Sequence, residues 1–265
     1  MIEFSIVLGA AFLSWALCIF LQPLLTHWKI WDHPNERSSH HESTLRGGGL
    51  EPVLVTLMAC LVWVCPLHFQ LGIVLAGALL LLTIVGFVDD QFGVSIVVRL
   101  IVQFFVSGLV VSQMVPAGDG SLGFFCSVLG LVAFTNFVNF MDGINGLAAG
   151  QLALMSLGLV WVVGVLGVSN SSGLTIMALV LAGGTMGFLP HNFPHARMFL
   201  GDAGSVPLGF ILGVCCIWAM VSANTPKDVF AIAAIPSYFV VEGLIAVLRR
   251  IFQSERWWTP HRTHA

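Results

Sequence analysis

The sequence predicts an all-α integral membrane protein, a polytopic helix bundle with about nine transmembrane helices, and three observations support this fold class. Of its 265 residues, 57% are hydrophobic and only 9% are charged, whereas soluble domains average about 25% charged residues. The apolar residues gather into runs long enough to cross a bilayer, which takes about 20 residues per helix. The basic residues gather between alternate runs. A soluble fold is therefore excluded.

The apolar runs set the order of the expected spans. Nine helices of about 20 residues use about 180 residues, which leaves only short loops between them. The chain begins without the basic segment and small-residue cleavage site of a removable signal peptide, so we expect the first run to remain a span. The expected spans are 2–22, 53–69, 71–88, 96–114, 121–138, 147–167, 173–189, 205–222 and 229–248.

The charges of the loops predict the orientation. With the N-terminus outside, nine of the ten basic residues lie at or near cytoplasmic loops, and only Lys227 lies outside. This positive-inside bias also places the C-terminus in the cytoplasm. All histidines except His68 and most acidic residues share the inner side, although insertion hardly depends on them. This excess of histidines and acidic residues on the inner side indicates chemistry at the cytoplasmic face. The alternative is that the outer loops are simply too short to hold polar residues.

Composition also limits the partners and the domain count. The scattered basic residues form no stripe that could follow a phosphate backbone, so we expect no nucleic acid to bind. The chain shows no repeat, low-complexity tract or soluble linker. We therefore expect residues 1–265 to form a single membrane domain.

The first inner loop and the tail carry cations and imidazoles. Arg37, Arg46 and three consecutive glycines would suit an anionic head group, although a solvated loop has the same composition. In the tail, His261 and His264 lie near the membrane.

The third run ends in two adjacent carboxylates, Asp89 and Asp90. Ionisable groups at this depth usually mark function. Two neighbouring negative charges repel unless a cation neutralises them, which favours a divalent metal or a proton-transfer role. Consecutive helical residues point about 100° apart, so we expect only one of the pair to face a given ligand. An ordinary interfacial helix end stays open as the alternative.

The fifth run ends in a turn that carries Asn139, Asp142 and Asn145. These side chains can accept hydrogen bonds from a base or a sugar hydroxyl, or contact a metal through water. The glycines between them let backbone approach a ligand closely. Asn and Asp are also common in plain turns, so the residues alone leave both interpretations open.

The loop before the eighth span carries Arg197, Asp202 and Ser205. The free N–H groups and the positive dipole at a helix start suit an anionic phosphate. Arg197 adds a forked donor for the phosphate. Asp202 could instead cap the helix, and capping does not exclude metal binding.

Glu242 lies inside the ninth expected span, behind Pro236, which can break a helix. A carboxylate at this depth is costly, so we expect it to face the bundle interior near the metal cleft. The alternative is a residue that snorkels to the interface.

Two other enzyme or transport classes fit less well. Leu200-Gly201-Asp202 partly matches the Gly-x-Gly-Asp motif of intramembrane aspartyl proteases, but those place both aspartates within spans, and the aspartates here lie at span ends. An ion-coupled transporter would carry acidic groups near the midplane on broken helices, and only Glu242 fits that pattern.

Together the motifs resemble the polyprenyl-phosphate N-acetylhexosamine-1-phosphate transferase superfamily. The resemblance covers nearly the whole chain. Within this superfamily, the chain is most similar to bacterial enzymes that start the synthesis of O-antigen or related envelope glycans. The matching segments are Pro-Asn-x-Arg-x-x-His, Arg-Gly-Gly-Gly, Gly-Phe-Val-Asp-Asp, Asn-Phe-Met-Asp-Gly-Ile-Asn-Gly and Phe-Leu-Gly-Asp-Ala-Gly-Ser.

The resemblance implies a reaction at the cytoplasmic face of the bacterial inner membrane. An N-acetylhexosamine-1-phosphate would pass from a UDP-sugar such as UDP-GlcNAc to undecaprenyl phosphate and release UMP, with Mg²⁺ or Mn²⁺ as cofactor. Membrane lipids are further partners, and a homodimer stays open. Family members usually continue into at least one more span.

The resemblance also implies roles for individual residues. Many members carry Asp at the position of Asn145. By matching position the implied roles are catalysis for Asp89 and Asp90, metal binding for Asp202 and Asp90, nucleotide-sugar binding for Asn139, Asp142, Asn145 and Arg197, and phosphate or lipid head-group binding for Arg37, Arg46, His261 and His264.

The chemistry agrees with these residue types. A lipid-phosphate oxygen attacks the β-phosphorus, and magnesium and arginine can stabilise the charge that develops on the phosphoryl oxygens. A phosphate monoester has a second pKa of about 6, so the nucleophile needs little help from a base. We therefore expect Asp202 and one of Asp89 or Asp90 to bind magnesium, with the other aspartate orienting or deprotonating the lipid phosphate.

Overall fold

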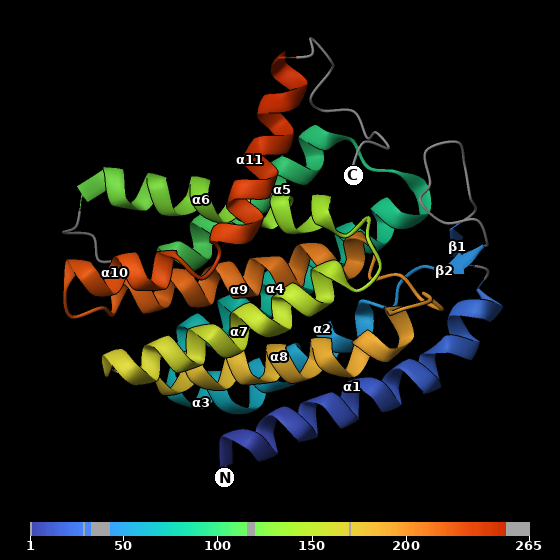
Figure 1. Ribbon diagram of the computed structural model, residues 1–265, viewed down its shortest axis with the longest axis horizontal. Coiled ribbons are helices and arrows are strands. Elements are labelled where there is room, and N and C mark those ends of the chain that lie inside the picture. The colour runs from blue at the N-terminus through green and yellow to red at the C-terminus, as the bar shows by residue number, and fades with distance from the viewer. Residues whose placement is uncertain (1, 29, 33–42, 116–119, 170, 253–265) are drawn as a thin grey trace.

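The computed structural model describes residues 2–28, 30–32, 43–115, 120–169 and 171–252 (Figure 1). These ranges are helical except for loops and a ribbon of two short antiparallel strands, β1 (Trp31–Asp32) and β2 (Thr44–Leu45). The helices are α1 (Ile2–His27), α2 (Leu50–Ala59), α3 (Cys65–Leu67), α4 (Phe69–Phe92), α5 (Ile96–Val111), α6 (Gly120–Met141), α7 (Leu147–Leu166), α8 (Ser172–Asn192), α9 (Asp202–Val221), α10 (Pro226–Ala233) and α11 (Ser237–Phe252). The expected all-α polytopic bundle is confirmed.

Helix length gives fewer membrane spans than the nine that the apolar runs predict. Seven helices of the described chain are long and apolar enough to cross a bilayer. One of these is continuous over Leu50–Leu67, because a π-helical segment at Cys60–Val64 joins α2 to α3. An eighth span results if α10 and α11 are counted as one. The run at 96–114 contains α5, which has only 16 residues. Nine spans therefore stay a prediction.

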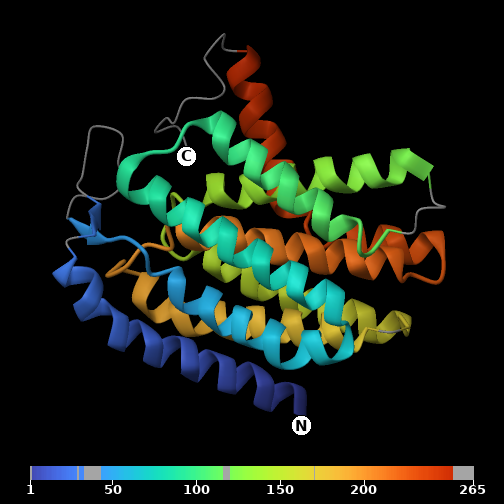
Figure 2. The same ribbon diagram turned by 180° about the vertical axis from the view of Figure 1, so that it is seen from behind.

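The ninth expected span is broken. Its two halves, α10 and α11, are bent by 60° relative to each other, and α11 points away from the rest of the bundle (Figures 1 and 2). The break includes Pro236, which lies in the turn between the helices. Proline has no backbone N–H and its ring obstructs the preceding turn of a helix, which explains why the helix does not continue.

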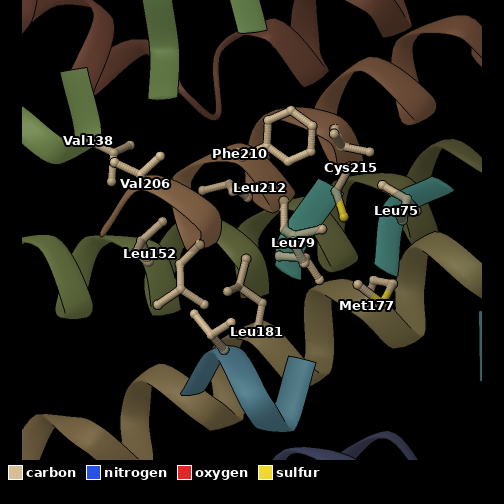
Figure 3. Close-up of a cluster of buried hydrophobic side chains, with 14 of the residues drawn as sticks. Leu75, Leu79, Val138, Leu152, Met177, Leu181, Val206, Phe210, Leu212 and Cys215 are labelled. Carbon is tan, nitrogen blue, oxygen red and sulfur yellow. The ribbon is translucent and has the colours of Figure 1, made fainter. Parts of the chain in front are cut away.

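The centre of the bundle is α9, whose side chains are nearly all buried. It packs against α4 and α6, while α1 lies on the outside of the bundle along α8 (Figure 1). Figure 3 shows the apolar cluster between these helices, where Phe210 and Leu212 of α9 lie near Leu79 of α4 and Leu181 of α8. Because hydrocarbon surrounds a membrane protein, such packing holds helices together mainly through close van der Waals contact.

Successive helices run in alternating directions and bring the polar motifs to one end of the bundle. There α4, α6 and α8 end while α5, α7 and α9 begin, as hydrogen bonds between these ends demonstrate. The strands β1 and β2 lie at the same end, on the right of Figure 1, and Leu45 of β2 forms a bridge with Met198 before α9. Segments far apart in the sequence thus form one polar surface.

Candidate active site

Two carboxylates from different helices share one arginine. Arg99 of α5 donates from a single nitrogen, Nη1, to Asp89 Oδ2 of α4 at 2.5 Å and to Asp202 Oδ2 of α9 at 3.1 Å. The side chain of Arg99 is 32% exposed, that of Asp89 10% and that of Asp202 25%. Both carboxylate oxygens therefore converge on one positive charge near the surface.

The turn between α4 and α5 brings Arg99 to this position. The Val94 N–H donates to Asp89 Oδ1 at 2.5 Å, so the turn is tied to the end of α4. Ser95 then caps α5 by accepting from the Val98 N–H. A serine side chain in this position satisfies one of the free N–H groups of the first turn. Arg99 follows one turn into the helix and reaches back to Asp89.

Asp90 has a different environment from its neighbour. Its two oxygens accept from the backbone N–H groups of Asp202, at 3.1 Å, and Ala203, at 3.0 Å, and its side chain is 3% exposed. The cap of α9 therefore comes from α4, and not from Asp202 as one sequence interpretation allowed. Gly201 precedes the helix with a φ of 69°, a conformation that favours glycine.

Asn139 at the end of α6 orients Asp202. Its Nδ2 group donates to Asp202 Oδ1 at 2.8 Å and to Ser205 Oγ at 2.9 Å. The Ser205 hydroxyl in turn donates to the Gly201 carbonyl at 2.9 Å. The two oxygens of Asp202 are thus engaged by α6 and by α5.

Asp142 lies next to the same group of acids. Loss of hydration raises the pKa of Asp142 well above its ordinary value, and the negative charges of Asp202 and Asp90 act in the same direction. A hydrogen bond from the Gly201 backbone and the charge of Arg46 act to lower it. Because nearby negative charges disfavour its ionised form, a cation at this end of the bundle would stabilise the ionised carboxylate.

The turn after α6 and the loop after α8 are joined to each other. Asn192 Oδ1 accepts from the Gly146 N–H at 2.6 Å, and Asn192 Nδ2 donates to the Met198 carbonyl at 3.0 Å. Asn145 Nδ2 donates to the Pro194 carbonyl at 3.4 Å. The side chains of Asn145 and Arg197 remain exposed on these joined loops, where a soluble ligand can reach them.

The remaining sequence-predicted residues divide into three groups. Arg46 lies at the site, with Nη1 3.7 Å from Asp90 Oδ1. Glu242 is half-buried on α11 and, within the described chain, makes no hydrogen bond or ion pair that would join it to the aspartates. Arg37, His261 and His264 lie outside the described residues.

Sequence reasoning missed two residues of the site. Arg99 is one of the nine basic residues that predict the orientation, but a cation one turn inside an apolar helix and shortly after two aspartates is itself a signal of pairing. Asn192 is 5% exposed and holds two loops together. Nothing in its sequence neighbourhood distinguishes it from an ordinary loop residue.

The donor set fits a magnesium ion that is completed by its substrates. Within the described ranges, no group of three or more His, Cys, Asp or Glu residues is arranged to hold a metal. Magnesium, however, is usually bound by one or two carboxylates together with water and substrate phosphates. Asp89 and Asp202, whose oxygens already share one cation, match that requirement.

The chain is similar in sequence to known transferases. A family model described as "Glycosyl transferase family 4" matches residues 72–220. The chain is 26% identical over 246 residues to a probable undecaprenyl-phosphate N-acetylglucosaminyl 1-phosphate transferase of Bacillus subtilis, covering 88% of this chain and 67% of that protein.

Two further relatives cover the chain to a similar extent. A decaprenyl-phosphate N-acetylglucosaminephosphotransferase of Mycolicibacterium smegmatis is 28% identical over 302 residues, which is 97% of this chain and 72% of the relative. A phospho-N-acetylmuramoyl-pentapeptide-transferase of Chlamydia muridarum is 28% identical over 251 residues, which is 82% of this chain and 72% of the relative. All three names describe transfer of a sugar phosphate.

Proposed function

The chain belongs to glycosyl transferase family 4, within the polyprenyl-phosphate N-acetylhexosamine-1-phosphate transferase superfamily, and on this premise we propose that it transfers an N-acetylhexosamine-1-phosphate from a UDP-sugar to undecaprenyl phosphate. The products are undecaprenyl-diphospho-sugar and UMP. One observation carries the proposal: Asp89 and Asp202, from separate helices, both pair with Arg99 at the end of the bundle where the polar loops meet.

In this proposal Asp89 and Asp202 hold Mg²⁺, or Mn²⁺ in its place. Sequence reasoning left open which of the adjacent aspartates binds the metal, and favoured Asp90. Because both oxygens of Asp90 accept backbone hydrogen bonds from α9, we assign the metal to Asp89 and give Asp90 the task of positioning Asp202. When bound, the ion neutralises charge on the pyrophosphate of the donor.

The proposed reaction is a single phosphoryl transfer. An oxygen of the lipid phosphate forms a bond to the β-phosphorus of the UDP-sugar, the bond from that phosphorus to the oxygen bridging to the α-phosphate breaks, and UMP leaves with the electron pair. The nucleophile is ionised near neutral pH, since its second pKa is about 6. Asn139 orients Asp202, and Arg99, Arg46 and Arg197 supply positive charge, so electrostatic stabilisation dominates over proton transfer.

The donor and the cellular location are parts of the same proposal. UDP-GlcNAc is the first donor to test, because two of the relatives are named for N-acetylglucosamine transfer. The joined loops that carry Asp142, Asn145 and Arg197 would receive the nucleotide sugar. The site would face the cytoplasm from the bacterial inner membrane, and the product would start an O-antigen or another envelope glycan.

A transfer assay tests the proposal. Purified protein with undecaprenyl phosphate, Mg²⁺ and radiolabelled UDP-GlcNAc should form labelled lipid and UMP in equal amounts, and Asp202→Asn should lower the rate by about 100-fold or more, because removal of one stabilising charge has effects of this size. Asp228→Asn is the matched control, since Asp228 is a half-buried acid in the first turn of α10, and an asparagine oxygen can still accept from the Thr225 N–H in its capping box. A wild-type protein that forms no lipid-linked sugar from any UDP-N-acetylhexosamine would refute the proposal.

A further inference from the structure

Arg99 takes the place of a cation between the two proposed metal ligands. One of its nitrogens lies 2.5 Å from Asp89 Oδ2 and 3.1 Å from Asp202 Oδ2. We infer that Arg99 is a built-in counter-cation that competes with the divalent metal ion for Asp89 and Asp202. This inference rests on the proposed function only in that the site takes a divalent cation.

The site needs such a charge even without a metal. Asp89 and Asp202 project from different helices, and Asp90 and Asp142 add negative charge beside them. Neighbouring carboxylates repel unless a cation lies between them. Arg46 cannot take this place while its Nη1 lies at Asp90, 3.7 Å from Oδ1. Among the described cations, Arg99 is therefore the one that joins α4 to the start of α9.

A divalent ion can readily replace Arg99 at these two carboxylates. Asp89 also accepts from Val94 and Asp202 from Asn139, so both carboxylates keep a partner when Arg99 leaves. The Arg99 side chain is 32% exposed, and ion pairs of partly exposed arginines are weak because water screens them. A divalent ion brings twice the charge to the same oxygens. Metal binding thus releases a forked donor that can pair with a phosphate oxygen.

Mn²⁺ binding measures the competition without any turnover. The full chain in detergent, with neither UDP-sugar nor lipid phosphate, is titrated with Mn²⁺ while electron paramagnetic resonance reports the free ion. We expect Arg99→Gln to bind Mn²⁺ at least about fivefold more tightly than wild type, because coupling between two ligands is commonly about 5-fold to 150-fold. Arg99→Lys keeps the charge and should bind Mn²⁺ nearly as wild type does.

Two controls separate this effect from changes in folding. Arg249→Gln removes an exposed arginine of α11 and should leave Mn²⁺ affinity unchanged. Arg99→Met, a second neutral variant that keeps the apolar stem, repeats the titration if Arg99→Gln does not fold. Either neutral variant should melt at a lower temperature than wild type without metal, and gain more from added Mn²⁺, because its two carboxylates then face each other uncompensated.

The outcomes distinguish this inference from the proposed function. Mn²⁺ affinity that stays equal or falls in both neutral variants would overturn the competition. Absence of Mn²⁺ binding to every variant would overturn it together with the metal part of the proposed function. Tighter binding in the neutral variants of a protein that transfers no sugar phosphate would support the competition and refute the transferase.

Discussion

The two adjacent aspartates at the end of α4 have separate tasks. Asp89 points to the side chains of α5 and α9, and Asp90 to the backbone of α9. Successive residues of a helix diverge by about 100°, and this angle is what lets neighbours meet different partners. In this chain, the second of the two consecutive carboxylates caps α9, and the first is the proposed metal ligand.

Replacing each aspartate should therefore have a different effect. Asp90→Ala removes the cap of α9, and loss of a cap commonly costs about 0.5–2 kcal/mol, so its unfolding free energy should fall by that amount. Asp89→Ala should lower Mn²⁺ affinity more than Asp90→Ala does. Thermal unfolding and Mn²⁺ titration of both purified variants measure the two effects. Identical effects of the two substitutions on both measurements would contradict the division of tasks.

Asn139 is predicted to act on the metal through Asp202. Asn139→Ala removes the hydrogen bond to Asp202 Oδ1 and should weaken Mn²⁺ binding by about 10-fold to 100-fold, since groups that orient a metal ligand have effects of this size. Titration against Thr135→Ala, a variant one turn earlier on α6 whose hydroxyl bonds only within the helix in the described chain, supplies the comparison. Equal affinity in the two variants would remove Asn139 from the site.

At the residue level, the sequence identified the polar groups that meet but not their contacts. The grouping of Asp89, Asp90, Asn139, Asp142 and Asp202 follows from span ends on one side of a membrane, which hydrophobicity alone predicts. The ion pairs of Arg99, and the hydrogen bonds by which Asn192 joins two loops, depend on the directions of the side chains in three dimensions. Those directions leave no periodic signal in a single sequence.

The contact between α4 and the start of α9 depends on a glycine. A Cβ added at Gly86 would lie 2.4 Å from the Asp202 carbonyl oxygen and 2.6 Å from its carbonyl carbon. Real side-chain carbons do not approach backbone so closely, so any other residue would push the two helices apart. This close approach is what allows Asp90 to reach the first N–H groups of α9.

Gly86→Ala should therefore damage the site as well as the packing. Overpacking of this kind costs about 1–3 kcal/mol, and displacement of Asp202 should also lower transferase kcat. Gly77→Ala is the matched control on the same helix, because a Cβ there meets nothing within 4 Å. Thermal unfolding and the transfer assay compare the two. A Gly86→Ala protein as stable and active as Gly77→Ala would contradict the account.

Element boundaries were predicted where the chain carries a strong local signal. The apolar runs predicted the helices, and Pro236 indicated the break between α10 and α11. The π-helical segment at Cys60–Val64 and the ribbon of β1 and β2 were not predicted. Each depends on neighbours, the ribbon through the bridge between Leu45 and Met198, and periodicity within one segment does not contain that information.

At the scale of the whole molecule, the loop charges predict the orientation of the protein in the membrane. The site lies at the end of the bundle that the distribution of Lys and Arg assigns to the cytoplasm. The order of the motifs and their meeting at one end could be predicted from charge and apolar runs. The span count could not, because α5 is shorter than a full span, and α10 and α11 are long enough only when the bent pair is counted as one span.

Cysteine labelling tests the orientation. Asn224 is exposed after α9 and Ile144 is exposed in the turn after α6, at opposite ends of the helices. A membrane-impermeant maleimide should label Asn224→Cys in intact spheroplasts and Ile144→Cys only after permeabilisation. Cys126 is the exposed native cysteine of the described chain and is replaced by Ser in both variants. The reverse labelling pattern would place the site on the outer face.

The most direct test of the metal-dependent transfer is a count of products with and without the ion. Wild-type protein is stripped with EDTA, supplied with undecaprenyl phosphate and a UDP-N-acetylhexosamine, and sampled before and after excess Mg²⁺ is added. We expect no UMP before the addition and equal amounts of UMP and lipid-linked sugar phosphate after it. Undiminished release of UMP in EDTA, or UMP formed without lipid-linked sugar, would contradict the role given to Asp89 and Asp202.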